Sequence, residues 1–305
     1  MNPIEIRFGG YQPPASVHSR AAARFGETLA ATLGDSVHFR LAGNVIAEGR
    51  KATDLLSMVA SGELTMCYFA ASYLSDLVPE LALFDLPFVV GDRETAYAAL
   101  DGPLGSQLQE GMLAASGYRI LGFWDNGFRH LTNRVQPIRR PEDCRGLSIR
   151  TLASELHTRT FRQLGFEPTV LDVKDLLAGV AAGTIDAQEN PLTNNWNFGF
   201  QNFQPYWTLT GHFFGVALWL CHEASWQAWP AGVRAAVEAA VPATVAAQRG
   251  FAEAEDADVL AKLAGSPVDP VRLTPAERSA FADAVRPIVD AERARLGEDL
   301  FALLR

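Results

Sequence analysis

The sequence predicts an α/β protein with two lobes of similar plan. Over about the first 70 residues, alternating apolar and polar segments are separated by helical patterns, in the order strand, helix, strand, helix, strand. This order predicts a largely parallel sheet with helices on its faces. The second half echoes the plan: a helical pattern ending at Gly183 leads into a short strand, as one ending at Gly62 does in the first half. Any α/β chain can show such an echo, so a single lobe stays open as the alternative.

Length and charge restrict the kinds of partner. The 305 residues fit one large domain or two of ordinary size, and 48% apolar with 20% charged residues is typical of a soluble globular protein. The net charge of −9 argues against nucleic acid, because phosphate binding needs a basic surface. A small anionic ligand is still compatible with this charge, since a few buried arginines decide the local potential.

The cysteines and the N-terminus narrow the cellular context. Cys67, Cys144 and Cys221 are odd in number and widely spaced, so we expect no disulfide framework and no CxxC metal pair. No apolar run reaches the length of a membrane span, and no secretory signal is visible. The chain is then either a cytoplasmic protein or a mature form whose signal peptide has been removed.

The N-terminal elements have clear patterns. Apolar residues alternate with charged ones over residues 4–8, which predicts a half-buried strand. Ser16 can cap a helix over residues 17–33, whose apolar residues step by four along one face until Gly34 stops it. The next expected elements are a strand at 37–41, a helix at 50–61 and a strand at 64–68.

Prolines and glycines punctuate residues 79–105, and strands and helices alternate beyond them. Asp172 can cap one of these helices, with Asp175 three residues on in a box-like arrangement, and Gly183 ends it. The expected elements are helices at 95–100, 105–116 and 154–164, and strands at 119–124, 147–150, 168–171 and 184–187.

The C-terminal part is expected to be mostly helical. Residues 231–263 form a long alanine-rich pattern, and Pro242 inside it predicts a kink. Thr274 is placed to cap a last helix, with proline at its first position and Glu277 three residues after the cap. We expect this helix to end near Arg295.

No enzyme signature is present. The chain has no GxGxxG, P-loop, GxSxG or HExxH motif, and its six histidines are too scattered to form a metal site. Asp125, Asp186 and Glu189 could provide an acid and a base, but each is better suited to hold an arginine or a backbone N–H. We therefore expect no enzyme, no cofactor and no dedicated metal site, and keep as an alternative an enzyme whose site has no local motif.

Three polar residues are candidates for holding a carboxylate. Arg150 ends a strand, and the carboxyl edge of an open α/β sheet is where ligands bind. Its planar fork matches a carboxylate with two parallel hydrogen bonds. Arg129 follows Gly127, which leaves room for close approach, and Asn190 is held extended by Pro191. A surface ion pair or a simple turn is the alternative for each.

Aromatic residues gather around these positions. An aromatic cluster is usually core, but some of its members could instead form the wall of a pocket for the apolar part of a ligand. The residues that we expect near such a wall are Tyr11, Trp124, Phe128, Phe198 and Phe213.

Several blocks in order resemble the solute-binding proteins of tripartite ATP-independent periplasmic (TRAP) transporters, of the DctP type. They are Gly-Phe-Arg ending at Arg129, then residues 141–150 ending in Gly-Leu-Ser-Ile-Arg, then residues 183–191 ending in Gln-Glu-Asn-Pro, then residues 209–212. The order and spacing match across about 90 residues, and the flanking pattern fits nearly the whole chain. The chain departs from the usual pattern at Thr151, Leu152, Asp175 and Ala187, none of which is one of the three polar anchors.

The resemblance implies a two-lobed periplasmic-binding-protein-like α/β fold with a central cleft. Lobe I would comprise residues 1–125 and 212–252, and lobe II residues 126–211 and 253–305, with the long kinked helix spanning both. The lobes would close on a small organic acid, which a monomeric protein would deliver in the periplasm to the membrane permease subunits. Arg150 would make the main carboxylate contact, with Arg129 and Asn190 as further contacts.

The identity of the acid is left with alternatives. The aromatic density favours an aromatic or apolar monocarboxylate. A hydroxy or keto acid would need polar partners such as Gln12, Ser72 or Asn126, and a C4-dicarboxylate would need a second cation. Two other functions stay open: an enzyme acting on a carboxylic acid through Asp125 or Glu189, and a sensor subunit. A cation beside the ligand is also open.

Overall fold

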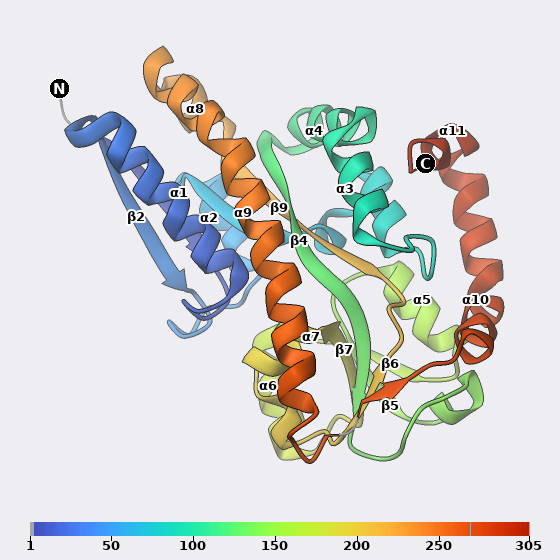
Figure 1. Cartoon of the computed structure of the whole chain (residues 1–305). Helices are drawn as coiled ribbons and strands as arrows, with labels where there is room; N and C mark the ends of the chain where they lie inside the picture. The colour runs from blue at the N-terminus through green and yellow to red at the C-terminus, as the bar shows by residue number, and fades with distance from the viewer. Residues whose placement is uncertain (1–2, 269, 305) are drawn as a thin grey trace. The chain divides into compact units, whose positions relative to one another are not determined.

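The computed structural model describes residues 3–268 and 270–304, and the chain divides into two compact units. Unit 1 contains the residues up to Ala71 together with Ser106–Asp125 and Val216–Ala254. Unit 2 contains Ser72–Gly105, Asn126–Gly215 and the residues from Glu255 onward. Figure 1 shows the elements of both units in chain order.

Unit 1 is built on a mixed sheet. Strand β1 (Ile4–Gly10) pairs in parallel with β2 (Val37–Asn44) on one side and with β3 (Met66–Ala70) on the other. Strand β9 (Phe214–His222) then runs antiparallel to β3, so the sheet is not parallel throughout. The helices of this unit are α1 (Val17–Leu33), α2 (Asp54–Ala60), α8 (Glu223–Ala228), most of α4 (Pro103–Ser116), and the short 3-10 helix η1 (Gly34–Ser36).

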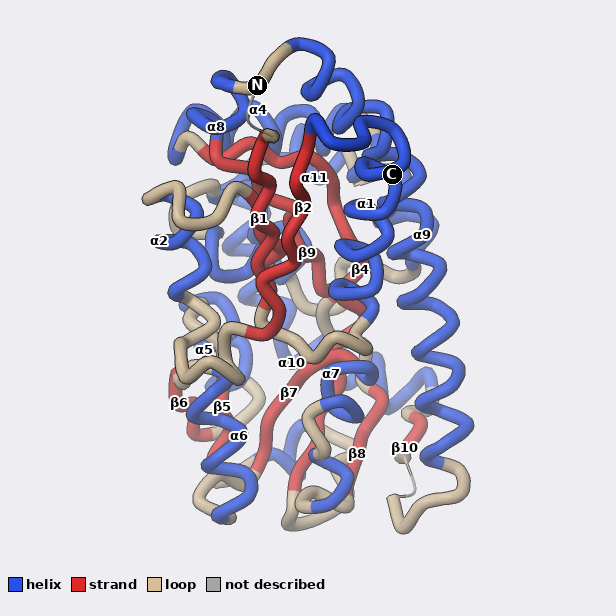
Figure 2. The backbone as a smooth tube through the Cα atoms, turned by 90° about the vertical axis from the view of Figure 1, so that its left-hand side faces the viewer, coloured by secondary structure: helices blue, strands red, loops and turns tan. Residues whose placement is uncertain are grey.

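Aromatic rings fill the core of unit 1. Phe8 of β1 stacks on Trp124 with ring centroids 6.0 Å apart, and His18 of α1 stacks on the same indole at 5.8 Å. Tyr68 and Trp219 complete the cluster from β3 and β9. All five side chains are fully buried. The strands of this unit are drawn side by side in Figure 2.

Unit 2 has its own sheet, which is centred on β7 (Ala187–Pro191). The last residues of β4 (Tyr118–Asn133), from Arg129 to Asn133, run antiparallel to β7. β5 (Ser148–Thr151) runs parallel to β7. β6 (Glu167–Val170) extends the sheet beyond β5, while β8 (Tyr206–Leu209) pairs with β4 and β10 (Val271–Arg272) with β8.

Unit 2 also contains several α-helices and short 3-10 helices. The α-helices are α3 (Arg93–Asp101), α5 (Glu155–Gln163), α6 (Val173–Ala182), α7 (Leu192–Asn197), α10 (Pro275–Leu296) and α11 (Glu298–Ala302). Short 3-10 helices are η2 (Ala71–Leu74), η3 (Pro79–Asp85), η4 (Pro141–Cys144) and η5 (Phe200–Asn202).

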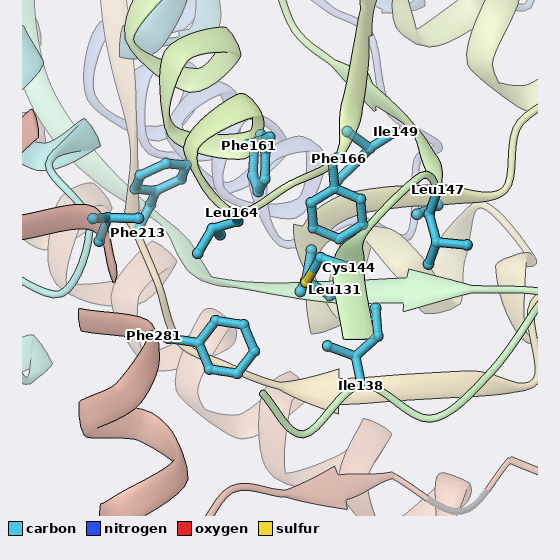
Figure 3. Packing of buried hydrophobic residues seen from close by; sticks show 12 residues of the cluster. Leu131, Ile138, Cys144, Leu147, Ile149, Phe161, Leu164, Phe166, Phe213 and Phe281 are labelled. Carbon is cyan, nitrogen blue, oxygen red and sulfur yellow. The ribbon is translucent and has the colours of Figure 1, made fainter. Parts of the chain in front are cut away.

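Two apolar clusters hold the second unit together. In the first, Phe161 of α5, Phe213 and Phe281 of α10 pack with Ile149 of β5 (Figure 3). In the second, Leu176 and Val180 of α6 pack with Trp207 of β8 and with Val259 and Leu263 at the end of α9. Packing in these clusters therefore fixes Ile149 on β5 and Trp207 on β8.

The long helix α9 (Ala231–Leu263) contributes to both units, since the division falls after Ala254. Its bounds are those expected from the sequence, and Pro242 lies inside it; the kink itself stays a prediction. The expected capping box at Thr274 and Glu277 is confirmed, and so is the cap by Asp172.

Two differences from the expected organisation stand out. Residues 72–105 cluster with unit 2, whereas the sequence-based division placed all of 1–125 in the first lobe. The strand expected at 184–187 instead spans Ala187–Pro191. Gly183 adopts a left-handed conformation (φ 69°) and Thr184 bonds back to Gly179 O, so those residues close α6 before the strand begins.

Candidate ligand-binding site

The three polar residues predicted from the sequence lie on three neighbouring strands of unit 2. Arg129 is on β4 opposite Pro191, Asn190 is on β7, and Arg150 is on β5 opposite Gln188 of β7. Because β7 lies between β4 and β5, residues that are 61 positions apart in the chain become strand neighbours.

Arg150 is buried without a carboxylate. Only 2% of the residue is exposed. Its Nε donates to the Leu171 carbonyl at 2.8 Å and its Nη2 to the Tyr73 hydroxyl at 3.3 Å. Within residues 3–268 and 270–304, no acidic side chain lies at ion-pair distance from it. A buried guanidinium with free N–H groups is costly unless an anion completes it, so the geometry suits an organic carboxylate.

The contact with Leu171 fixes the direction of the guanidinium. Leu171 follows β6, and its own N–H donates to the Thr151 carbonyl beside Arg150. Asp172 next to it caps α6 by accepting from Lys174 N. The side chain of Arg150 is thus tied to the rigid junction of β6 and α6, which sets its orientation in advance.

Arg129 has a different environment. Its Nε lies 2.5 Å and its Nη2 2.7 Å from the two carboxylate oxygens of Glu189, and neither side chain is more than 3% exposed. Nη2 also donates to the Glu189 carbonyl and, at 3.3 Å, to Asn190 Oδ1. These bonds occupy most of its donors, so the contacts of Arg129 favour a role in fixing β7 and the side chain of Asn190.

Two histidines complete the surroundings of Glu189. His212 Nε2 lies 3.3 Å from Glu189 Oε2, and His157 Nδ1 lies 3.7 Å from Oε1. Burial alone would raise the pKa of Glu189, but the charge of Arg129 and these neighbours hold that pKa well below its ordinary value. Burial lowers the pKa of His212, so this ring is neutral at pH 7.

His157 pairs with a second buried carboxyl group, that of Asp85. Its Nε2 lies 2.9 Å from Asp85 Oδ1, with both side chains almost fully buried. Burial acts to lower the pKa of His157, but the charge of Asp85 and the bonds to Asp85 and Glu189 outweigh it, and the pKa is raised. The ring of Phe213 stacks on His157 with centroids 4.3 Å apart and keeps water from the pair.

Asp85 anchors the segment that carries Tyr73. The same Asp85 oxygen accepts from Ser72 Oγ at 2.7 Å. Sequence reasoning named Ser72 as a possible ligand partner but missed Tyr73, Asp85 and His157. These residues belong to no local motif, and only the folded chain brings positions 73 and 150 together.

Asn190 belongs to a network of buried carboxamides. Its Nδ2 donates to Gln188 Oε1 at 2.6 Å, and its carbonyl accepts from Asn195 Nδ2 at 3.1 Å. Gln188 in turn donates to Thr132 and Asn195. One N–H of the Asn190 amide is not used in these bonds, so Asn190 remains suited to donate to a ligand.

The expected aromatic residues lie mostly in cores. Trp124 is 0% and Tyr11 6% exposed, and both pack on Tyr68 in unit 1. Phe213 is 1% exposed inside the first apolar cluster of unit 2. Phe128 is half-buried, with the ring of Phe214 edge-on at 5.1 Å, and Phe198 packs on Phe200 at 5.8 Å. Of these five residues, Phe128 and Phe198 keep a partly exposed ring, and the other three are buried.

The described residues hold no group of three or more histidine, cysteine or acidic side chains that could bind a metal ion. Over the same residues, none of the helices combines the length and the apolar character needed to cross a bilayer. The three cysteines are buried and unpaired.

The α/β fold and the buried guanidinium of Arg150 are compatible with a protein that binds a small organic anion. The sequence matches the family model of bacterial extracellular solute-binding protein family 7, DctP, over residues 8–295. The chain belongs to this family.

Individual relatives agree with this assignment. The chain is 31% identical, over 96% of its length, to protein y4mM of Sinorhizobium fredii, and 30% identical, over 67% of its length, to a solute-binding protein of Verminephrobacter eiseniae. It spans 53% and 61% of the lengths of these two relatives.

Solved structures show the same fold. The sugar acid binding protein DctPAm of Advenella mimigardefordensis, in complex with galactonate, matches with a TM-score of 0.93 and 26% identity over 100% of this chain and 97% of that one. A TRAP periplasmic solute-binding protein of Sulfurospirillum deleyianum, with bound succinate, gives 0.92 and 27% over 100% and 99%. The predicted fold class and the resemblance to TRAP solute-binding proteins of the DctP type are confirmed.

Proposed function

We propose that this protein is the solute-binding component of a TRAP transporter and captures a small organic acid whose carboxylate is held by Arg150. The observation that carries the proposal is the buried guanidinium of Arg150, which, among the residues that the structure describes, bonds to a carbonyl and a hydroxyl and to no acidic side chain. The relatives with bound galactonate and succinate support a small carboxylate as the ligand class. Asn190 is the second proposed contact.

The ligand that we infer has a polar body. The aromatic or apolar monocarboxylate favoured by the sequence relied on Tyr11, Trp124, Phe128, Phe198 and Phe213. Three of these rings, Tyr11, Trp124 and Phe213, are buried against other rings. The groups around Arg150 and Asn190 are instead a hydroxyl and carboxamides. Galactonate in a relative also carries hydroxyl groups along its whole length.

We also propose the periplasm as the location, membrane permease subunits as the partners and a monomer as the working form. The relative with bound succinate is itself a TRAP periplasmic protein. A binding role without turnover is supported by the environment of Glu189, one of the two carboxylates that an enzyme would use. Glu189 is fully buried and occupied by Arg129, so it is not positioned to act as a base.

The test is thermal unfolding and calorimetry of the purified protein against a panel of carboxylic acids. A ligand at a hundred times its dissociation constant adds about 2.7 kcal/mol to the free energy of unfolding, which raises the melting temperature measurably. We expect Arg150→Ala to abolish this shift and Arg162→Ala, an exposed arginine on α5, to retain it. Unchanged affinity in Arg150→Ala would overturn the proposal.

A further inference from the structure

Tyr73 lies beside Arg150 although 77 positions separate them in the chain. The Tyr73 hydroxyl oxygen is 3.3 Å from Arg150 Nη2. Tyr73 is part of η2, directly after β3, and is half-buried. Nothing in the proposed function so far gives this hydroxyl a role.

The backbone next to Tyr73 is held firmly in unit 2. Ser72 Oγ donates to Asp85 Oδ1 at 2.7 Å, and His157 Nε2 approaches the same oxygen to 2.9 Å. All three side chains are buried. His157 is on α5, which begins shortly after β5, so the anchor of Ser72 and the strand of Arg150 belong to one packed body. Tyr73 is therefore pre-positioned relative to Arg150, which a selective contact requires.

The geometry of the guanidinium defines a gap between the ligand carboxylate and Tyr73. Arg150 uses its Nε–H for Leu171 and one Nη2–H for Tyr73, which leaves the outer Nη1–H and Nη2–H for a bidentate carboxylate. When one nitrogen donates hydrogen bonds to two oxygens, the O···N···O angle is about 120°. A carboxylate oxygen and the Tyr73 oxygen, both bonded to Nη2, would then be about 5 Å apart. That distance is too long for one direct hydrogen bond, but two consecutive hydrogen bonds through one oxygen atom between them would bridge it.

A hydroxyl on the carbon next to the carboxylate fits this gap. In the planar conformer of a 2-hydroxy acid, the hydroxyl oxygen lies about one hydrogen-bond length from a carboxylate oxygen, which leaves about one more to Tyr73. A hydroxyl on carbon 3 would lie away from the line between the carboxylate oxygen and the Tyr73 oxygen. Resting on the proposed function, we propose that Tyr73 is a specificity-determining residue that selects 2-hydroxy carboxylates through a hydrogen bond to the 2-hydroxyl.

The experiment compares matched acids by calorimetry: 2-hydroxybutyrate, 3-hydroxybutyrate and butyrate, and malate with succinate. Of these two sets, the butyrates and the malate–succinate pair, the one that contains the tightest-binding acid is then measured with the variants. In the wild type we expect the 2-hydroxy acid to bind about fivefold more tightly than its partner without that hydroxyl, as one neutral hydrogen bond is worth about 1 kcal/mol. In Tyr73→Phe the ratio of the two affinities should fall to about one.

Two control variants separate this role from a structural one. Tyr206→Phe removes the same group from β8 of the same unit and should leave the ratio of the two affinities unchanged. Arg150→Lys should weaken the binding of both acids, because an ammonium group cannot hold the carboxylate with the two parallel bonds of a guanidinium. Equal binding of both acids to the wild type, or a preference that survives in Tyr73→Phe, overturns the role of Tyr73 and leaves the proposed function intact. Failure of every acid to bind the wild type refutes the proposed function and this role with it.

Discussion

Arg129 and Glu189 form a bidentate ion pair inside unit 2, with N–O distances of 2.5 and 2.7 Å and almost no exposure to solvent. The two residues lie on adjacent strands, and the pair joins β4 to β7 through side chains as well as through the backbone ladder. Breaking such a pair from one side leaves a charge buried without a partner, which costs far more than the pair contributes net.

We therefore expect Arg129→Ala to lower the free energy of unfolding by about 3 to 5 kcal/mol, because Glu189 keeps its charge in a dry site. Urea denaturation measures this change. The matched control is Arg134→Ala, which removes an ion pair with Asp186 that is 46% exposed on the arginine side and should cost at most about 1 kcal/mol. Equal costs for the two variants would contradict the role assigned to Arg129.

Stability should fall at alkaline pH through His157. Its pKa in the folded protein is raised above the ordinary 6.5, so its contribution is fully present below pH 6.5 and is lost as the pH rises through the folded value. Thermal unfolding between pH 6 and 9 should show this loss. In His157→Gln the melting temperature should depend less on pH over the alkaline part of this range. An unchanged dependence would show that another group titrates.

Stability should also fall at acid pH, through Glu189. Its pKa lies well below the ordinary 4.5, so its contribution is present above pH 4.5 and is lost as the pH falls through the folded value. Unfolding measured between pH 5 and 2 should show a steep acid loss. Glu277, a partly exposed carboxylate in the cap of α10, offers a comparison: Glu277→Gln should leave most of this acid loss in place.

Gly127 should not tolerate a side chain. Its φ of 90° disfavours other residues, and a Cβ there would lie 3.0 Å from Pro191 Cβ on β7. We expect Gly127→Ala to cost about 1 to 3 kcal/mol in chemical denaturation. Gly43→Ala on β2 is the control, because a Cβ there meets nothing within 4 Å and should be neutral or slightly stabilising. Equal effects of the two substitutions would refute this explanation.

Gln248 of α9 pairs with Asp125 of β4 through both groups of its carboxamide. Asp125 N–H donates to Gln248 Oε1 and Gln248 Nε2 donates to the Asp125 carbonyl, each at 2.7 Å and buried. Gln248→Leu should cost about 2 to 4 kcal/mol in urea denaturation, since it leaves two backbone groups without these partners. Gln109→Leu, which breaks a single longer bond of 3.3 Å in a half-buried position, should cost less than about 1 kcal/mol.

Much of the secondary structure could be read from the sequence. The capping box at Thr274 and Glu277 and the bounds of α9 depend on neighbours within one or two turns, and these expectations are confirmed. The strand at Ala187–Pro191 was misplaced because the residues after Gly183 close α6 through contacts that periodicity does not show. The antiparallel pairing of β9 with β3 involves residues about 150 positions apart and has no local signature.

The candidate site was predicted only in part. Placing Arg150, Arg129 and Asn190 in one region required no more than strand ends and a family resemblance, and the structure brings their three strands together. Glu189 was expected to hold an arginine or a backbone N–H, but which arginine it holds, and the partner of Arg150, were not predictable. Glu189 for Arg129, and Tyr73 for Arg150, come from other parts of the chain, and an arginine with a carboxylate partner has the same local sequence as one without.

The sequence by itself determined the α/β class, the helix caps, the acidic net charge and the family. All of these follow from local periodicity, composition or ordered short blocks. Only the tertiary structure decided which arginine is neutralised, which aromatic rings are core, and that residues 72–105 pack with unit 2. The physical reason is that burial and charge pairing depend on which distant side chains meet, and a pair such as Asp85 and His157 is created by packing alone.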